Sequence, residues 1–325
     1  MTTPTVDHHA ILAPVLAEFE VARAATRQRV LQGLAIIASV ALLAIAAALW
    51  FKIVVLAIVS GVAALITALI WSSFPIAQFN SRFKHEVITR LVAQVNPTLT
   101  YQPTMGIEQP VFQASRLFHT DIDRYGKEDL VEGTIGATHV RFSEVHAEYK
   151  TETTDSDGDS KTTWHTIFRG IYVVADFNKY FQGHTIIMPG AGAGLAGAIG
   201  GVFERMGNAV NFGPLQPVAL EDPEFEACFN VRSTDQVEAR YILSPALMRR
   251  LIDFQATHGN TVRLAFLGNT LHIALPKDRN HFEAPSVWSS APIGAAQLQS
   301  YTETLAIAQS IVDDLNLNLR IWSRV

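Results

Sequence analysis

The sequence predicts an α+β membrane protein, in which a two-span transmembrane helical hairpin precedes a cytoplasmic, β-rich α+β region of two units. Two observations lead to this fold class. Residues 30–74 are almost entirely Ala, Ile, Leu and Val, and Lys52 is their only charged residue. The later part of the chain changes to segments rich in Val, Ile, Thr and aromatic residues, which is typical of strands, mixed with a few helical patterns.

The apolar stretch is long enough for two membrane crossings. As one helix, residues 30–74 would be roughly 67 Å long, whereas the hydrocarbon core of a bilayer is about 30 Å thick. Two spans fit, at about 34–50 and 53–71, with the break at Phe51-Lys52 because Lys52 prefers water. A signal peptide is excluded, since the apolar run starts late and continues into a second span.

The flanking charges predict the orientation. Lys52 is the only basic residue between the two spans. The basic residues outside the spans are Arg23, Arg27 and Arg29 before the first and Arg82, Lys84 and Arg90 after the second. The positive-inside rule therefore places both termini and the bulk of the chain in the cytoplasm. The expected localisation is the bacterial inner (plasma) membrane, as a multi-pass protein.

The polar content of the hairpin favours an anchor over a pore. Its polar side chains inside the bilayer are Gln32, Ser39, Ser60 and Thr67, whose hydrogen bonds a helix can satisfy internally.

The expected partners are the lipid bilayer through residues 30–74 and a protein partner or a second copy of the chain. No nucleic acid is expected, because 30 acidic residues outnumber 25 basic ones. The single cysteine, Cys228, excludes an internal disulfide.

Changes in composition and in hydrophobic pattern along the chain divide it into six predicted segments. They are an N-terminal cytoplasmic helix (1–29), the transmembrane hairpin (30–74), a juxtamembrane helix (75–97), a β-rich cytoplasmic domain (98–188), a Gly/Ala/Pro-rich linker (189–220) and a second α+β cytoplasmic domain (221–325). Within the last segment, Ala239 to Leu243 resembles a strand, Ser244-Pro245 begins a helix, and Gly268-Asn269 joins two strands in a hairpin. A final helix is expected from about Gly294 to Leu315.

Several short blocks resemble a known family. They are 125–129 (YGKED), 133–136 (GTIG), 142–145 (FSEV), 168–170 (FRG), 175–179 (ADFNK), 222–225 (DPEF) and 235–243 (DQVEARYIL). Together they are similar to a bacterial membrane family known only as a domain of unknown function (number three-one-three-seven). The resemblance implies an N-terminal helix, two spans and a cytoplasmic β-rich region, and it implies no activity.

Two motifs match a functional pattern only in part. Residues 192–197 read G-x-G-x-x-G, but Pro189 interrupts the approach and no βαβ unit follows, so a linker is the better interpretation than a dinucleotide site. Residues 155–159 read Asp-Ser-Asp-Gly-Asp, but the spacing and the strand-like flanks do not fit an EF-hand. A solvated hairpin tip is predicted there.

Glu144, His146 and Glu148 form the candidate metal site. At strand spacing they project from one face, and carboxylates with imidazole can bind a divalent ion. The alternative is a solvent-facing strand surface, with Val145, Ala147 and Tyr149 toward the core. No catalytic residue and no cofactor is predicted, since no nucleophile motif is present.

The sequence therefore favours a membrane-anchored cytoplasmic binding or scaffolding protein of unknown ligand. The alternatives are a metal-dependent enzyme that uses the Glu144, His146 and Glu148 face, and a subunit of an oligomeric channel or transporter.

Overall fold

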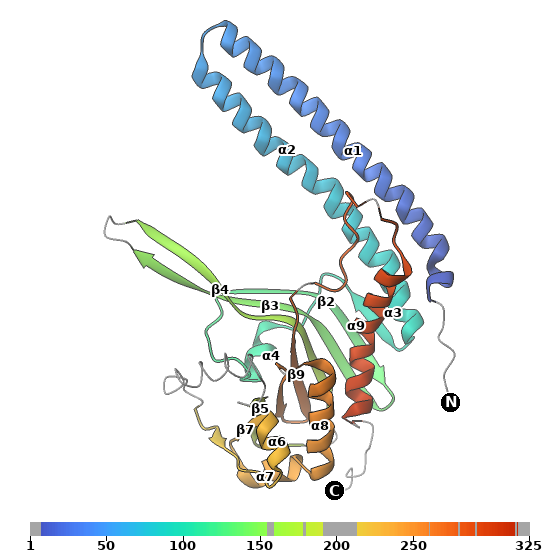
Figure 1. Cartoon of the computed structure of the whole chain (residues 1–325), viewed down its shortest axis with the longest axis vertical. Coiled ribbons are helices and arrows are strands. Elements are labelled where there is room, and N and C mark those ends of the chain that lie inside the picture. The colour runs from blue at the N-terminus through green and yellow to red at the C-terminus, as the bar shows by residue number, and fades with distance from the viewer. Residues whose placement is uncertain are drawn as a thin grey trace. The chain divides into compact units, whose positions relative to one another are not determined.

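The computed structural model describes residues 8–154, 159–177, 180–190, 213–259, 261–278, 280–289, 291–315 and 317 (Figure 1). They form two compact units. The first unit is drawn from residues 1–94 and 282–302, and the second from residues 95–281 and 303–325. The fold is α+β, with a large antiparallel sheet and two long apolar helices.

Two long helices dominate the first unit. Helix α1 (His8–Trp50) and helix α2 (Val54–Phe83) run antiparallel, and the predicted break at Phe51-Lys52 is confirmed (Figure 1). Lys52 has a positive φ of 58°, which turns the chain without a glycine. Helix α2 continues through a π-helical turn, η1 (Lys84–Ile88), into α3 (Thr89–Val95). The helix ends just before Asn96-Pro97, close to the end of the predicted juxtamembrane helix (75–97).

Both long helices are apolar enough to cross a membrane. Only 11% of the most apolar window of the first helix is buried, and 0% of that of the second. Within the pair, the indole of Trp71 packs so closely over Gly33 that a Cβ there would overlap it. The helices thus cover each other along one line and leave their remaining apolar faces exposed.

Residues 282–302 pack on the other end of the helix pair, within the same unit. Arg23 Nη1 donates to the carbonyl oxygen of Ala291 at 2.8 Å, and Glu20 Oε1 accepts from the amide of Ile293 at 2.6 Å. Phe83 is fully buried, with its ring centroid 5.6 Å from that of Phe19 and 6.1 Å from that of Tyr301. These contacts give the helix pair a packed, partly aromatic end outside its apolar length.

The second unit contains a nine-stranded antiparallel sheet in the order β1-β2-β3-β4-β9-β8-β5-β7-β6. The strands are β1 (Leu99–Gln102), β2 (Arg124–Ile135), β3 (Thr138–Thr154), β4 (Ser160–Asp176), β5 (His184–Pro189), β6 (Gln216–Pro217), β7 (Phe229–Ser233), β8 (Arg263–Leu267) and β9 (Thr270–Pro276). The helices are α4 (Gln109–Ala114), α6 (Pro223–Cys228), α7 (Gln236–Ile242), α8 (Pro245–His258) and α9 (Ala295–Asp314), of which α9 contributes its first turns to the other unit.

One face of the sheet is covered by α4 and the segment after it. Phe112 of α4 is buried, and its ring centroid lies 4.9 Å from Tyr172 and 5.7 Å from Phe168, both on β4. Ile186 of β5 and Ala265 of β8 belong to the same buried cluster. The core of this unit therefore extends across strands on both sides of residues 189–220.

This sheet differs from the predicted division into a β-rich domain (98–188) and a second α+β domain (221–325). Strand β4 pairs with β9, and β5 pairs with both β7 and β8, so strands from the two predicted domains alternate in one sheet. The sequence around a strand does not show which distant strand it pairs with, so this pairing could not be predicted. Most of the predicted linker, residues 191–212, lies outside the described residues.

The predicted strand at Ala239 to Leu243 was wrong, because Ala239 to Ile242 belong to helix α7 and Leu243 is its C-cap. Asp235 caps this helix, since its Oδ1 accepts from the amides of Val237 at 2.8 Å and Glu238 at 2.9 Å. Ala239 and Ile242, three residues apart, form its buried face. The start of α8 after Ser244 and the β8–β9 hairpin at Gly268-Asn269 are confirmed.

Candidate functional site

The predicted metal ligands lie at alternate positions of β3. In the pairing with β2, Glu144 is opposite Glu128, His146 is opposite Gly126, and Glu148 is opposite Arg124. The Glu144 carboxylate accepts from the amide of His281 at 2.6 Å. The Glu148 carboxylate pairs with Arg124 at 2.6 Å and lies 3.6 Å from His146 Nε2. Both carboxylates are buried and occupied by protein donors.

Metal binding at this face stays a prediction. Among the described residues, the ligand atoms of Glu144, His146 and Glu148 do not form a group within 4.8 Å of one another, so an ion would require their side chains to rearrange. The hypothesis predicts one divalent ion per purified chain and its loss in His146→Ala. Elemental analysis that finds no stoichiometric ion in the wild type would reject it.

A chain of polar side chains, of which Tyr172 and His272 are buried and Thr270 is half-buried, crosses from β4 to β9. Tyr172 Oη lies 3.1 Å from His272 Nδ1, and Thr270 Oγ1 lies 3.0 Å from His272 Nε2. The Thr270 hydroxyl donates its proton to the carbonyl oxygen of Leu267 at 2.8 Å, so it accepts from Nε2–H of His272. Nδ1 is then the acceptor for the hydroxyl of Tyr172. The geometry therefore defines a neutral His272 with its proton on Nε2.

Burial, with smaller contributions from His184 and Arg141, lowers the pKa of His272 from 6.5 to about 4. The unfolded chain thus binds a proton between pH 6.5 and pH 4 that the folded chain does not bind. We expect the free energy of unfolding to fall as the pH is lowered through this window, by about 3 kcal/mol in total. Chemical denaturation at a series of pH values measures this slope.

The control for this pH dependence is His272→Asn, which cannot titrate. Burial also lowers the pKa of His184, His119 and His258, so the variant should keep part of the slope. An unchanged slope in His272→Asn would show that His272 does not titrate in this window.

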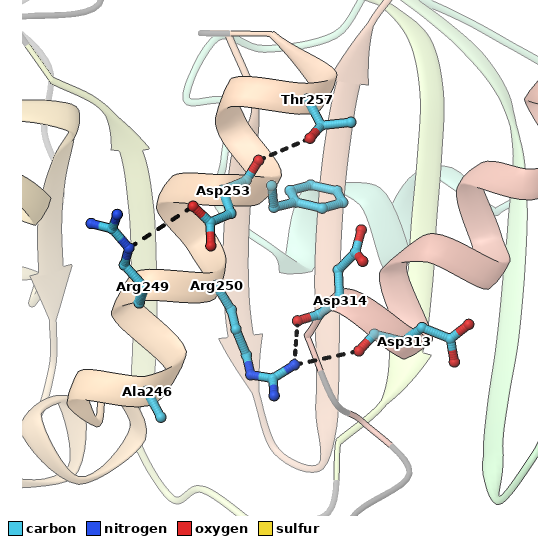
Figure 2. A pocket seen from close by; sticks show the side chains of 8 residues that line it. Ala246, Arg249, Arg250, Asp253, Thr257, Asp313 and Asp314 are labelled. Atoms are coloured by element: carbon cyan, nitrogen blue, oxygen red, sulfur yellow. Dashed lines mark hydrogen bonds and ion pairs between the residues drawn. The ribbon is translucent and has the colours of Figure 1, made fainter. Parts of the chain in front are cut away.

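A pocket of about 560 Å³ lies between α8 and the C-terminal end of α9, within the second unit (Figure 2). It is lined by two arginines, three aspartates, a threonine, a phenylalanine and an alanine: Arg249, Arg250, Asp253, Asp313, Asp314, Thr257, Phe254 and Ala246. Arg250 Nη1 donates to the carbonyl oxygen of Asp314 at 2.8 Å and thereby caps the end of α9.

The charged side chains that line the pocket differ in the partners that they contact. Arg249 pairs with Glu224 at 2.7 Å. It also lies 4.0 Å from Asp253 (Figure 2). The carboxylate of Asp313 accepts from Gln309 at 2.7 Å. The carboxylate of Asp314 lines the pocket and makes no hydrogen bond among the described residues, although its charge acts on His258. The lining contains no histidine, cysteine or serine, so its chemistry suits recognition of a cationic or amide group better than nucleophilic catalysis.

The sequence contains only a faint signal for this pocket. Arg249-Arg250 and Asp313-Asp314 stand out as charged pairs at helix positions, but Arg250 and Asp314 are 64 residues apart. The G-x-G-x-x-G motif at 192–197 lies outside the described residues, and so do residues 155–158 of the predicted hairpin tip. The pocket is therefore a candidate binding region that only the structure brings together.

Comparisons with known proteins add a family and a structural neighbour. Residues 166–317 match the model of a family described as "Protein of unknown function (DUF3137)", in agreement with the resemblance noted in the sequence. No curated protein matches the chain. Among solved structures, the mycobacterial trehalose monomycolate transport factor A, TtfA, is 10% identical with a TM-score of 0.35, over 71% of this chain and 96% of that one. A similarity of this size gives no argument about function.

Proposed function

We propose that the chain is a membrane-anchored binding protein, with α1 and α2 as the anchor and the second unit as a recognition module on the cytoplasmic side. The exposed apolar surface of the helix pair supports the anchor. Large side chains such as Leu42, Val62 and Leu65 are 67%, 52% and 62% exposed. An apolar surface of this length on a water-soluble monomer would be unusual, whereas lipid covers it without cost.

The polar groups of the helix pair also favour an anchor. The hydroxyls of Ser39, Ser60 and Thr67 each donate to the carbonyl oxygen four residues earlier, at 2.8 Å. They need no partner outside their own helix, so they do not call for a polar path through the membrane. The basic residues that flank both helices support an orientation in a bacterial inner membrane with both termini in the cytoplasm.

The α8–α9 pocket supports the recognition role, because it places the carboxylate of Asp314 beside the apolar side chains of Ala246 and Phe254. The experiment is photo-crosslinking in native membranes, with p-benzoylphenylalanine in place of Ala246 on the rim. The control carries the same residue in place of Val237, which is 77% exposed and does not line the pocket.

A discrete adduct is expected from position 246, and Asp314→Asn should reduce it. The control position should give no such adduct. If both positions give the same products, or if position 246 gives none, the pocket does not bind a partner.

A further inference from the structure

Residues 282–294 form a strap beside the helix pair, within the first unit. The strap rises along the pair before it turns back into α9 (Figure 1). A β-turn lies within it, in which the amide of Ser289 donates to the carbonyl oxygen of Ser286 at 3.0 Å. The amide of Trp288 also donates to Ser286 Oγ, at 3.3 Å. We call residues 286–289 the strap turn.

The strap is held on the helix pair on both sides of the strap turn. Lys84 Nζ pairs with Glu283 Oε1 at 3.1 Å, and the carbonyl oxygen of Glu283 accepts from the hydroxyl of Tyr301 at 2.5 Å. After the turn, Arg23 donates to the carbonyl oxygen of Ala291. Lys84 and Arg23 are both buried. These contacts give the strap turn a defined position beside the helices.

The same contacts place the strap turn toward the apolar stretch of the helices. The ring centroids of Phe19 and Phe83 are 5.6 Å apart, so Phe19 and Lys84 lie at nearly the same height on the antiparallel pair. Arg23 is one helical turn nearer to the apolar residues 30–74, by about 6 Å. The strap therefore rises toward the apolar stretch between its contact with Lys84 and its contact with Arg23.

Trp288 is exposed on the strap turn. Its side chain is 49% exposed, whereas that of Val287 is buried. Among the described residues, its indole contacts no other ring and no cation, in contrast to Trp164, which lies 4.3 Å from the guanidinium carbon of Arg124. Tryptophan has a large apolar ring and one N–H donor, a combination that favours the headgroup level of a bilayer.

The surface of α1 beyond Arg23 suits a membrane surface by its charge. Arg27 and Arg29 are exposed and lie between Arg23 and the apolar stretch. Arginines next to a membrane span are attracted to anionic headgroups. Arg29 is about 9 Å beyond Arg23 along the helix, and the backbone of Trp288 is within roughly 11 Å of that of Ala291. Headgroups in contact with Arg27 and Arg29 are therefore within reach of the Trp288 side chain.

We propose that Trp288 inserts into the headgroup region of the membrane surface that Arg27 and Arg29 face. The strap turn is then a third membrane contact of the chain, besides α1 and α2. The phospholipid surface is its occupant, because the indole presents its apolar ring to the upper acyl chains and its N–H to ester or phosphate oxygens. The contact is continuous with the apolar surface of the helix pair, and the proposal rests on the proposed anchor.

The experiment is quenching of tryptophan fluorescence by brominated lipids. The full-length chain is reconstituted in vesicles of phosphatidylcholine and phosphatidylglycerol, with bromine near the headgroup end of the acyl chains. A variant that keeps Trp288 alone has phenylalanine in place of the other tryptophans, Trp50, Trp71, Trp164 and Trp322. The brominated lipid should quench the emission of Trp288, and iodide in the water should quench it weakly.

Two matched variants each keep a different single tryptophan. Trp164, which is 41% exposed in the second unit, should keep its emission in brominated vesicles. Trp50, at the far end of α1 from the strap, should be quenched because of the anchor itself. If Trp50 is quenched but Trp288 is quenched no more than Trp164, the proposal is wrong and the anchor stands. If Trp50 is not quenched either, the anchor fails and the proposal fails with it.

A second measurement keeps the other tryptophans in place. Trp288→Cys in a Cys228→Ser background carries a nitroxide label, and Val237→Cys in the same background is the control, at a 77% exposed position of the second unit. Oxygen, which dissolves in lipid, should relax the label at 288 more than a water-soluble nickel chelate does, with the reverse order at 237. A label at 288 that is as accessible to the nickel chelate as the label at 237 would overturn the proposal.

Discussion

Placing an arginine at the middle of each long apolar helix should remove the chain from the membrane fraction. The double variant Leu42→Arg, Val62→Arg changes two exposed side chains near the centres of the two predicted spans. Each arginine at the centre of a span costs about 2.5 to 3.5 kcal/mol, so the pair costs roughly 5 to 7 kcal/mol. The measurement is the fraction of chain that stays with membranes after an alkaline carbonate wash.

The direction of the effect of these substitutions depends on whether the helices lie in water or in a bilayer. In water, replacing an exposed Leu or Val by Arg would improve solubility, because it removes apolar surface. In a bilayer, the same change opposes insertion. The control is Val237→Arg, a similar substitution at a 77% exposed position of the second unit, and it should leave the membrane fraction unchanged. Full retention of the double variant in washed membranes would contradict the anchor.

Gly170→Ala should strongly destabilise the second unit. Gly170 lies on β4 opposite Pro276 of β9 and has a φ of 150°, which side chains rarely adopt. A Cβ there would overlap the carbonyl oxygen of Leu275 and lie 2.7 Å from the amide nitrogen of Lys277. Backbone atoms cannot move aside without separating the two strands. The expected loss is about 3 kcal/mol or more in the free energy of unfolding, or roughly 6 to 12 °C in the unfolding midpoint.

The matched control for Gly170→Ala is Gly126→Ala. Gly126 is also a strand residue, on β2, but a Cβ there would meet only ordinary contacts at 3.7 Å and beyond. Its replacement should be neutral or slightly stabilising, because alanine restricts the unfolded chain. Thermal unfolding of both variants in detergent gives the comparison, and equal midpoints would show that the β4–β9 contact does not require a glycine.

Local signals predicted the two long helices, the start of α8, the last helix and the β8–β9 hairpin. The charge of Lys52 located the turn between α1 and α2, and the juxtamembrane helix predicted for 75–97 agrees with the end of α3 at Val95. The buried stripe of the last helix, which includes Leu298, Leu305 and Val312, follows its helical spacing. These features depend on residues within one or two turns of each other, so a single sequence contains the information.

Long-range features were not predictable in this way. The β4–β9 pairing joins residues about a hundred apart, as in the contact between Tyr172 and His272. Helix α7 was missed because its short apolar run also fits a strand, and the cap at Asp235 decides the outcome. The α8–α9 pocket combines side chains from two separate helices, and no local spacing marks it.

Labelling of single cysteines in whole cells tests the central claim most directly. Cys228 is the only cysteine, so Cys228→Ser provides a background without thiols. In this background, Lys52→Cys lies at the turn between the helices, and Val237→Cys lies at an exposed position of the second unit. An anchored chain with a cytoplasmic body predicts that a membrane-impermeant maleimide labels position 52 in cells with a permeable outer envelope, and position 237 only after lysis. Labelling of position 237 before lysis, or of position 52 only after it, would contradict this topology.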